Sequence, residues 1–229
     1  MPFFLGLLYG FAVFGQQGNN WYFGANAGLS FNSNPPTALL NGALNTYEGC
    51  ASISDNNGQL LFYTDGVSVW NKNNLVMPNG GGLKGNPSSS NAAIIIPKPG
   101  TNNIFYVFTA DASENQNLNG YNYSEIDMTL NGGLGDVTSN KNILLYAPST
   151  EKLTAVRDAN GIDIWVITHS WGDNGWQVFK VDCHGVNNTP VKSNAGSSYT
   201  YTYNNPNASQ GLPIWNEGSV GCLKASPDG

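Results

Sequence analysis

Charged residues are scarce in this chain, and those present are mostly acidic. Lys, Arg, Asp and Glu make up 10% of its 229 residues, the formal net charge is −6, and Arg157 is the one arginine. Nucleic acids and anionic membrane surfaces are bound through concentrations of Lys and Arg, so neither is an expected partner. A sialidase grips a carboxylate with a cluster of arginines, and that class of enzyme is excluded as well.

Long apolar runs are missing, apart from one near the N-terminus. Residues 3–14 are apolar except for Gly and Tyr, but a membrane-spanning helix needs about 20 such residues, so no direct membrane span is expected. The run has the length of the apolar segment of a signal peptide, and residues 13–15 offer a small residue before a cut at Gln16. We therefore expect residues 1–17 to be a signal peptide, and the protein to be secreted or placed on the outer cell surface. Because no Lys or Arg precedes the run, a buried first strand is the alternative.

Cysteine is limited to Cys50, Cys183 and Cys222. An odd number leaves at least one thiol unpaired within the chain, and the spacing fits no zinc-binding pattern. Cys50 and Cys222 occupy the same place in a repeated phrase, so we expect them on equivalent strands. Both free thiols and a disulfide are compatible with this spacing.

Turn-forming and aromatic residues are abundant instead. The chain contains 28 Gly, 12 Pro, 11 Tyr, 10 Phe and 6 Trp. These residue types favour short strands joined by tight turns over helices. We therefore expect an all-β fold, with residues 18–229 forming one domain.

One hairpin pattern recurs three times. It begins with a short apolar strand, continues through a turn containing Gly and ends with a second strand that is rich in apolar and aromatic residues. The three segments are ASISDNNGQLLFYTD, AAIIIPKPGTNNIFYVFTAD and LTAVRDANGIDIWVITH. Thr64, Thr109 and Thr168 occupy matching places near the end of the second strand. This recurrence predicts three equivalent hairpins.

Further alternating segments follow the hairpins and extend each into a unit of three or four antiparallel strands, as VSVWNKNNLVM and GWQVFKVD show. Such repeats are typical of β-propeller blades of the WD type, and a β-sandwich is the alternative. The closing GCLKASPDG repeats the start of GCASISDNNG, so it predicts the first strand and turn of a further blade whose second strand would follow Gly229. We expect residues 18–229 to form a partial propeller of about three blades and the start of another.

Several segments together resemble a known group of proteins. In order, they are NNWYFGANAGLSFN, YEGCASISDNNGQLLFYTDGVSVWNKNNLVMPNG, AAIIIPKPG, MTLNGGLGDV, EKLTAV and WVITHSW. They look like the N-terminal WD-repeat-like propeller region of gliding-motility-associated surface proteins of Bacteroidetes-type bacteria, which carry a C-terminal sorting domain for type IX secretion. The resemblance covers nearly all of the chain after residue 18. It implies export, adhesion or assembly within a longer chain, and it supplies no catalytic residues.

Two of the turns contain residue types that also bind calcium. They are Asp55, Asn57 and Gly58 in one turn, and Asp158, Asn160, Gly161 and Asp163 in the other. Neither turn has the complete ligand series or the closing Glu of a calcium loop. Asn-Gly is also the dipeptide of tight hairpins whose two central residues both take positive φ. We favour the structural turn over the calcium site and expect no cofactor.

Catalytic residue types are present without a recognisable pattern. The histidines are His169 and His184, with Ser170, Asp173, Asp182 and Cys183 close to them in sequence. They form a Ser/His/Asp or Cys/His site only if folding brings them together. A glycoside hydrolase would need two carboxylates about 5–9 Å apart, for which Glu48 with Glu125 or Glu151 are candidates. We expect no enzyme; the alternative is an exported polysaccharide-acting hydrolase with carboxylates in the propeller mouth.

Tryptophan is frequent for a chain of this size. We expect most of the six, Trp21, Trp70, Trp165, Trp171, Trp176 and Trp215, to pack between blades. Trp171 and Trp176 flank a Gly-rich turn and are the candidate platform for a sugar or a protein. The expected function is therefore a non-enzymatic, exported or cell-surface module that binds protein or polysaccharide.

Overall fold

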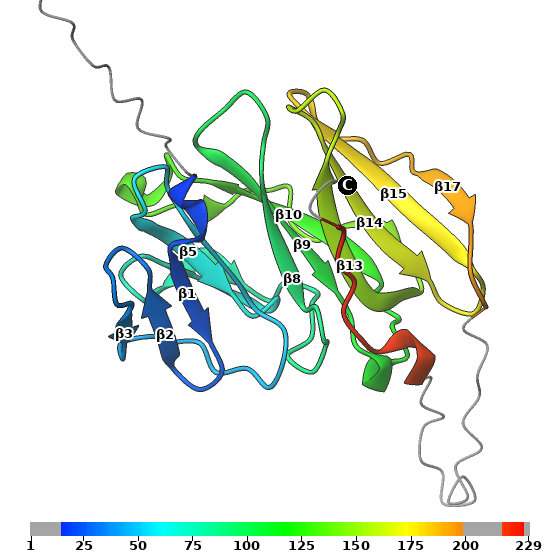
Figure 1. The fold of residues 1–229 in the computed structure, drawn as a ribbon, viewed down its shortest axis with the longest axis horizontal. Helices are drawn as coiled ribbons and strands as arrows, with labels where there is room; N and C mark the ends of the chain where they lie inside the picture. The colour runs from blue at the N-terminus through cyan, green and yellow to red at the C-terminus, as the bar shows by residue number, and fades with distance from the viewer. Residues whose placement is uncertain (1–14, 199–216, 227–229) are drawn as a thin grey trace, which may run out of the picture.

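The protein is built from antiparallel β-sheets joined by short loops, as the computed structural model shows (Figure 1). The structure describes residues 15–198 and 217–226. The helical segments in these ranges are short 3-10 turns, beginning with Gln16–Gly18, and no helix there is long and apolar enough to cross a membrane. The predicted all-β fold is confirmed. Most of the predicted signal peptide, residues 1–14, lies outside the described residues, as do Trp215 and residues 227–229.

Four sheets follow one another along the chain. The first has the order β1-β2-β3 and the second the order β4-β5-β6-β7. The third has the order β8-β9-β10-β11 with β12 beside β10, and the fourth has the order β13-β14-β15-β16 with β17 beside β15. Strands of the first two sheets are β1 (Asn20–Phe23), β2 (Ala27–Ser30), β3 (Thr37–Leu39), β4 (Ala51–Ser54), β5 (Leu60–Thr64), β6 (Ser68–Asn71) and β7 (Val76–Gly81). Strands of the last two are β8 (Ala93–Pro97), β9 (Ile104–Ala110), β10 (Tyr121–Asp127), β11 (Asp136–Val137), β12 (Ile143–Tyr146), β13 (Ser149–Arg157), β14 (Ile164–Ser170), β15 (Gly175–Asp182), β16 (Gly185–Val186) and β17 (Val191–Asn194).

The three predicted hairpins are confirmed as β4–β5, β8–β9 and β13–β14. Their threonines hold equivalent positions in the pairing: Thr64 lies opposite Ala51, Thr109 opposite Ala93 and Thr168 opposite Leu153. All three threonines are buried. The repeat in the sequence is thus a repeat of strand register.

The hairpin turns differ from the prediction in their backbone. Positive φ occurs at Gly58 (78°) and Gly161 (72°), but Asn57 and Asn160 do not adopt it. The prediction that both central residues take positive φ is therefore wrong. The reason lies in the Asp55 side chain, whose Oδ1 accepts hydrogen bonds from the backbone N–H groups of Asn57 (2.8 Å) and Gln59 (2.9 Å) and closes a wider turn.

Each sheet packs against the next sheet along the chain, and the core lies between them. One cluster joins the first and second sheets, and in it Tyr63 stacks between Tyr22 (4.4 Å between ring centroids) and Trp70 (5.5 Å). A second cluster, around Phe62 and Phe105, joins the second and third sheets. A third cluster joins the third and fourth sheets and consists of Ile96, Tyr106, Phe108, Ala110, Tyr121, Leu153, Ile164, Val166, Phe179 and Val181. Burial of apolar surface between successive sheets therefore holds the array together.

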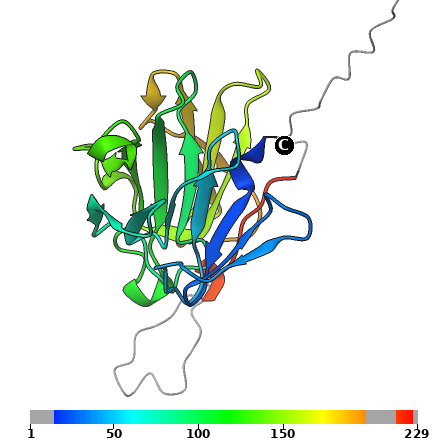
Figure 2. The ribbon, with the colours of Figure 1, turned by 90° about the vertical axis from the view of Figure 1, so that its left-hand side faces the viewer.

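The first strands of the four sheets form a row. β1 contacts β4, β4 contacts β8, and β8 contacts β13; Figure 2 shows the strands of successive sheets standing side by side. Residues 217–226 contact β13 and also Ser90, which precedes β8. The Lys152 ammonium on β13 donates to the carbonyl oxygens of Gly218 (2.8 Å) and Val220 (3.0 Å), so this segment is tied to the fourth sheet.

Candidate functional site

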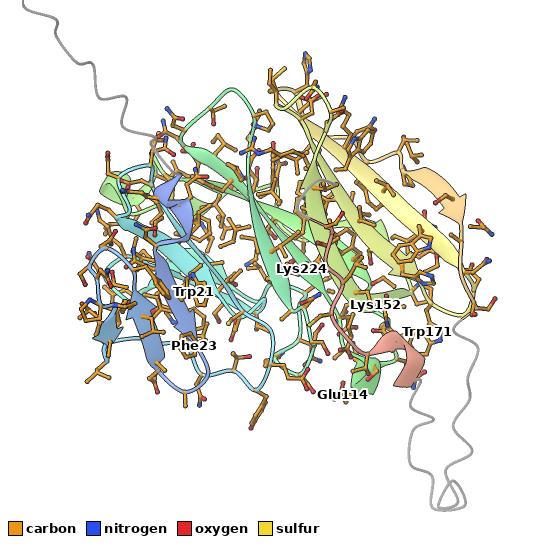
Figure 3. All side chains as sticks on the ribbon, in the orientation of Figure 1. Trp21, Phe23, Glu114, Lys152, Trp171 and Lys224 are labelled. Atoms are coloured by element: carbon orange, nitrogen blue, oxygen red, sulfur yellow. The ribbon has the colours of Figure 1, made fainter. Side chains whose placement is uncertain are left out.

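The two tryptophans predicted to form a platform lie at the fourth sheet and are half-buried. The Trp176 ring on β15 packs edge-on against His169 (4.6 Å between centroids), and its Nε1 donates to the Ala195 carbonyl (3.1 Å). Trp171 follows β14, and its backbone N–H donates to the Pro148 carbonyl (3.3 Å) (Figure 3). Internal contacts therefore occupy one side of the Trp176 ring.

A group of exposed aromatic residues lies on the first sheet, where it was not predicted. Trp21 is 51% exposed and Phe23 37%, and both project from β1 (Figure 3). The Phe31 ring, 39% exposed, lies 4.9 Å from that of Trp21. The alternate residues of β1, Asn20 and Tyr22, are buried. The expectation was that most tryptophans pack between blades; Trp70 belongs to the core, whereas Trp21 is exposed.

An apolar hollow of about 530 Å³ lies between β1 and β4, and we call it the aromatic hollow. Its lining consists of Trp21, Tyr22, Phe23, Leu29, Cys50, Ala51 and Ser52. The polar ends of two of its rings are already occupied, since Trp21 Nε1 donates to the Gly18 carbonyl (2.8 Å) and the Tyr22 hydroxyl donates to Asn41 (3.2 Å). The hollow therefore offers mainly apolar surface.

The Cys50 thiol in this lining is kept neutral by its surroundings. Burial, followed by the carboxylate of Asp65, raises the pKa of Cys50 above its ordinary value. The thiolate is the reactive form of cysteine, so Cys50 acts in the hollow as a small apolar side chain.

Two of the predicted carboxylates meet at Ser90. Glu151 is fully buried, and its two carboxylate oxygens accept the backbone N–H groups of Ser90 and Ser113, each at 2.9 Å. Glu48 is exposed and accepts the Ser90 hydroxyl (3.1 Å). Glu125 lies apart on β10, where it accepts the Thr138 hydroxyl (3.0 Å). Of the candidate pairs, the fold thus brings together Glu48 and Glu151, but it uses both oxygens of Glu151 to hold two loops.

His169 is buried, and the groups near it in sequence serve other contacts. Its Nδ1 lies 2.7 Å from the carbonyl oxygen of Ser170, whose hydroxyl accepts a hydrogen bond from Gln177 (3.0 Å). Asp173 accepts the Gly175 N–H (2.7 Å) within the following turn. Burial lowers the pKa of His169. The described hydrogen bonds of His169, Ser170 and Asp173 therefore do not link the three residues into a Ser/His/Asp site.

A lysine contacts the second of the two turns that contain calcium-binding residue types. Lys180 Nζ lies 2.8 Å from Asp163 and 3.4 Å from Asp158, and its hydrogen bond lowers the pKa of Asp163. Asn160 also donates to Asp163 (2.8 Å) and accepts the N–H groups of Ile162 and Asp163 (both 2.9 Å). The oxygen atoms of Asp158, Asn160 and Asp163 that could bind calcium therefore contact Lys180 or other groups of the turn.

The three cysteines are free thiols. Cys222 lies in the segment beside β13, with its Sγ 3.7 Å from the carbonyl oxygen of Ser90. Cys183 lies between β15 and β16, where ligand atoms of Asp182, Cys183 and His184 come within 4.8 Å of one another. The fold thus assembles an Asp/Cys/His group.

Comparisons with protein-family models, with curated proteins and with solved structures found no match for this chain. The resemblance to gliding-motility-associated surface proteins is therefore an expectation that these comparisons do not test.

Proposed function

We propose that this chain is a non-enzymatic, exported or cell-surface interaction module, built as a partial β-propeller within a longer gliding- or adhesion-associated protein. Its binding site is the aromatic hollow, and its partner is a protein that inserts apolar side chains there. The observation that carries the proposal is the exposure of Trp21 and Phe23 beside this hollow.

The order of the sheets supports a propeller over a β-sandwich. Four sheets pack in chain order, whereas a sandwich packs two sheets face to face. In a propeller the sheets surround an axis and their first strands lie next to one another, as in the row β1, β4, β8 and β13. Residues 221–226 repeat residues 49–54 in sequence; Gly221 and Cys222 contact Ser90, and Lys152 of β13 binds the carbonyl groups of Gly218 and Val220 just before them. This placement favours the start of a further blade.

The chemistry of the hollow favours a protein over a sugar as partner. Sugars stack on aromatic rings but also need hydrogen-bond partners for their hydroxyl groups, and Trp21 Nε1 is already committed to Gly18. Buried aromatic anchors with an apolar surround are typical of protein-binding hot spots. Exposure of large apolar side chains on one surface also marks interaction sites generally.

The environment of the carboxylates supports a non-enzymatic role. A general acid or base must reach the substrate proton, yet Glu151 is fully buried and accepts two backbone N–H groups. Glu48 is exposed but contacts the Ser90 hydroxyl, with Glu151 on the far side of the same residue. The hydrolase alternative would therefore have to operate with Glu48 as its accessible carboxylate.

Incubation with a panel of polysaccharides tests the proposal against that alternative. We expect release of reducing ends no faster than in buffer, for the native chain and for Glu48→Gln alike. The matched control is Glu125→Gln, which changes a carboxylate on another sheet. Steady release that is abolished by Glu48→Gln but retained by Glu125→Gln would overturn the non-enzymatic proposal.

A further inference from the structure

The turn between β15 and β16 carries three side chains with metal-binding atoms. Asp182 pairs with Gly185 across the hairpin, so Cys183 and His184 are the two residues of the turn itself. Cys183 is exposed, the His184 side chain is 90% exposed, and the Asp182 side chain is 33% exposed. All three groups can therefore be reached from solvent.

Two of the three distances between these atoms match those in a tetrahedral metal site. Cys183 Sγ lies 3.5 Å from His184 Nδ1, which in turn lies 3.4 Å from Asp182 Oδ1. In tetrahedral zinc sites, with bonds of about 2.3 Å to sulfur and 2.0–2.1 Å to nitrogen or oxygen, the ligand atoms are about 3.5 Å (S to N) and about 3.4 Å (N to O) apart. His184 Nδ1 thus already lies at tetrahedral spacing from both other ligand atoms, while the sulfur and the carboxylate oxygen lie within 4.8 Å of each other.

The turn is held in this conformation by its own backbone. The His184 N–H donates to Asp182 Oδ1 (2.7 Å) and keeps this carboxylate over the turn. Gly185 has a φ of 121°, and a Cβ added there would lie 3.0 Å from the Tyr106 hydroxyl oxygen, so glycine is required at the end of the turn. The turn backbone and the Asp182 carboxylate are therefore positioned before an ion arrives, which reduces the entropy that binding must overcome.

The surrounding charges favour a cation at this end of the fourth sheet. Asp158 and Asp163 lie on the neighbouring hairpin and share the single ammonium group of Lys180. Among the described ion pairs Asp182 has no lysine or arginine partner and is paired with His184. A divalent cation would offset the remaining negative charge.

We propose that Asp182, Cys183 and His184 form a binding site for a borderline divalent transition-metal ion of the zinc type, with one oxygen, one sulfur and one nitrogen ligand. Thiolate and imidazole ligands select such ions over Mg²⁺ and Ca²⁺. Three protein ligands leave the fourth tetrahedral position for water or for a group from a bound partner. This site is separate from the aromatic hollow and does not depend on the proposed function.

Titration of the full, reduced chain with Co²⁺ tests the site, because Co²⁺ substitutes for zinc and is coloured. We expect one equivalent to give a thiolate-to-cobalt absorption band and the visible bands of a tetrahedral ion, and we expect Zn²⁺ to displace it. Cys183→Ser should abolish the thiolate band, and His184→Ala should weaken binding at least about tenfold. Cys222→Ser, the matched control, should bind as the native chain does.

Two results would overturn the proposal. One is the absence of the thiolate band at saturating Co²⁺; the other is a band that persists in Cys183→Ser, since the thiolate would then come from Cys50 or Cys222. Cys183, His184 and Cys222 are all exposed, so the three variants should fold, and their circular dichroism and melting temperatures will establish whether they do.

Discussion

Replacing Glu151 by leucine is expected to lower the free energy of unfolding by about 3–5 kcal/mol. Glu151 is fully buried on β13, and its carboxylate accepts the N–H groups of Ser90 and Ser113 from two loops of the third sheet. Leucine has a similar volume but no acceptor, so both donors would lose their partner. For a chain of this size the melting temperature should fall by roughly 10 °C, which calorimetry or circular dichroism would measure.

Glu48→Leu is the matched control for this prediction. Glu48 also contacts Ser90, but from the exposed side and through the serine hydroxyl, so its replacement should cost less than about 1 kcal/mol. Glu151→Gln, which keeps one acceptor oxygen, should fall between the two. Equal losses for Glu48→Leu and Glu151→Leu would contradict the structural role assigned to Glu151.

Replacing Gly49 by alanine is expected to destabilise the fold by about 3 kcal/mol or more. A Cβ at this position would lie 2.1 Å from the backbone nitrogen of Ala92 and 2.6 Å from the carbonyl oxygen of Ser89. Both are backbone atoms, so relief requires moving the loop before β8 and breaking the hydrogen bond from Gly49 N–H to Ser89 (3.0 Å). Gly81→Ala, where a Cβ meets nothing within 4 Å, is the control. Chemical denaturation giving similar stabilities for the two variants would show that the two backbones do not approach as described.

The sheets were largely predictable because the residues that determine each hairpin lie close together in the sequence. Each hairpin places two alternating strands and a turn within about twenty residues, so period and turn residues together specify the pairing. The strand register was also predictable from the sequence. Thr64, Thr109 and Thr168 occupy matching positions in the three sequence segments, and they occupy matching positions in the pairing of the three hairpins. The turn conformation did not follow, because the Asp55 side chain supplies an acceptor that the Asn-Gly dipeptide does not reveal.

The candidate site depended on contacts that the sequence does not encode locally. In β1, apolar residues occur on both faces, a pattern also found in strands that are covered on both sides. The packing of the first sheet on the second leaves Trp21 and Phe23 exposed and buries Tyr22 against Tyr63. The burial of Glu151 similarly depends on loops distant in sequence. Asp182, Cys183 and His184 are consecutive in the sequence, but the distances between their ligand atoms depend on the hairpin between β15 and β16.

The central claim is that the aromatic hollow binds apolar side chains of a protein, and a peptide selection tests it most directly. The native chain would be used to select binders from a random peptide library, and their dissociation constants would be measured for the native chain, Trp21→Ala and Tyr47→Ala. Tyr47 is 92% exposed and lies outside the described lining of the hollow, which makes it the matched aromatic control. We predict peptides with aromatic or aliphatic anchors whose affinity falls about thirtyfold in Trp21→Ala, as for a hot-spot residue, and stays within about twofold in Tyr47→Ala. Selected peptides that bind Trp21→Ala as tightly as the native chain would contradict the account.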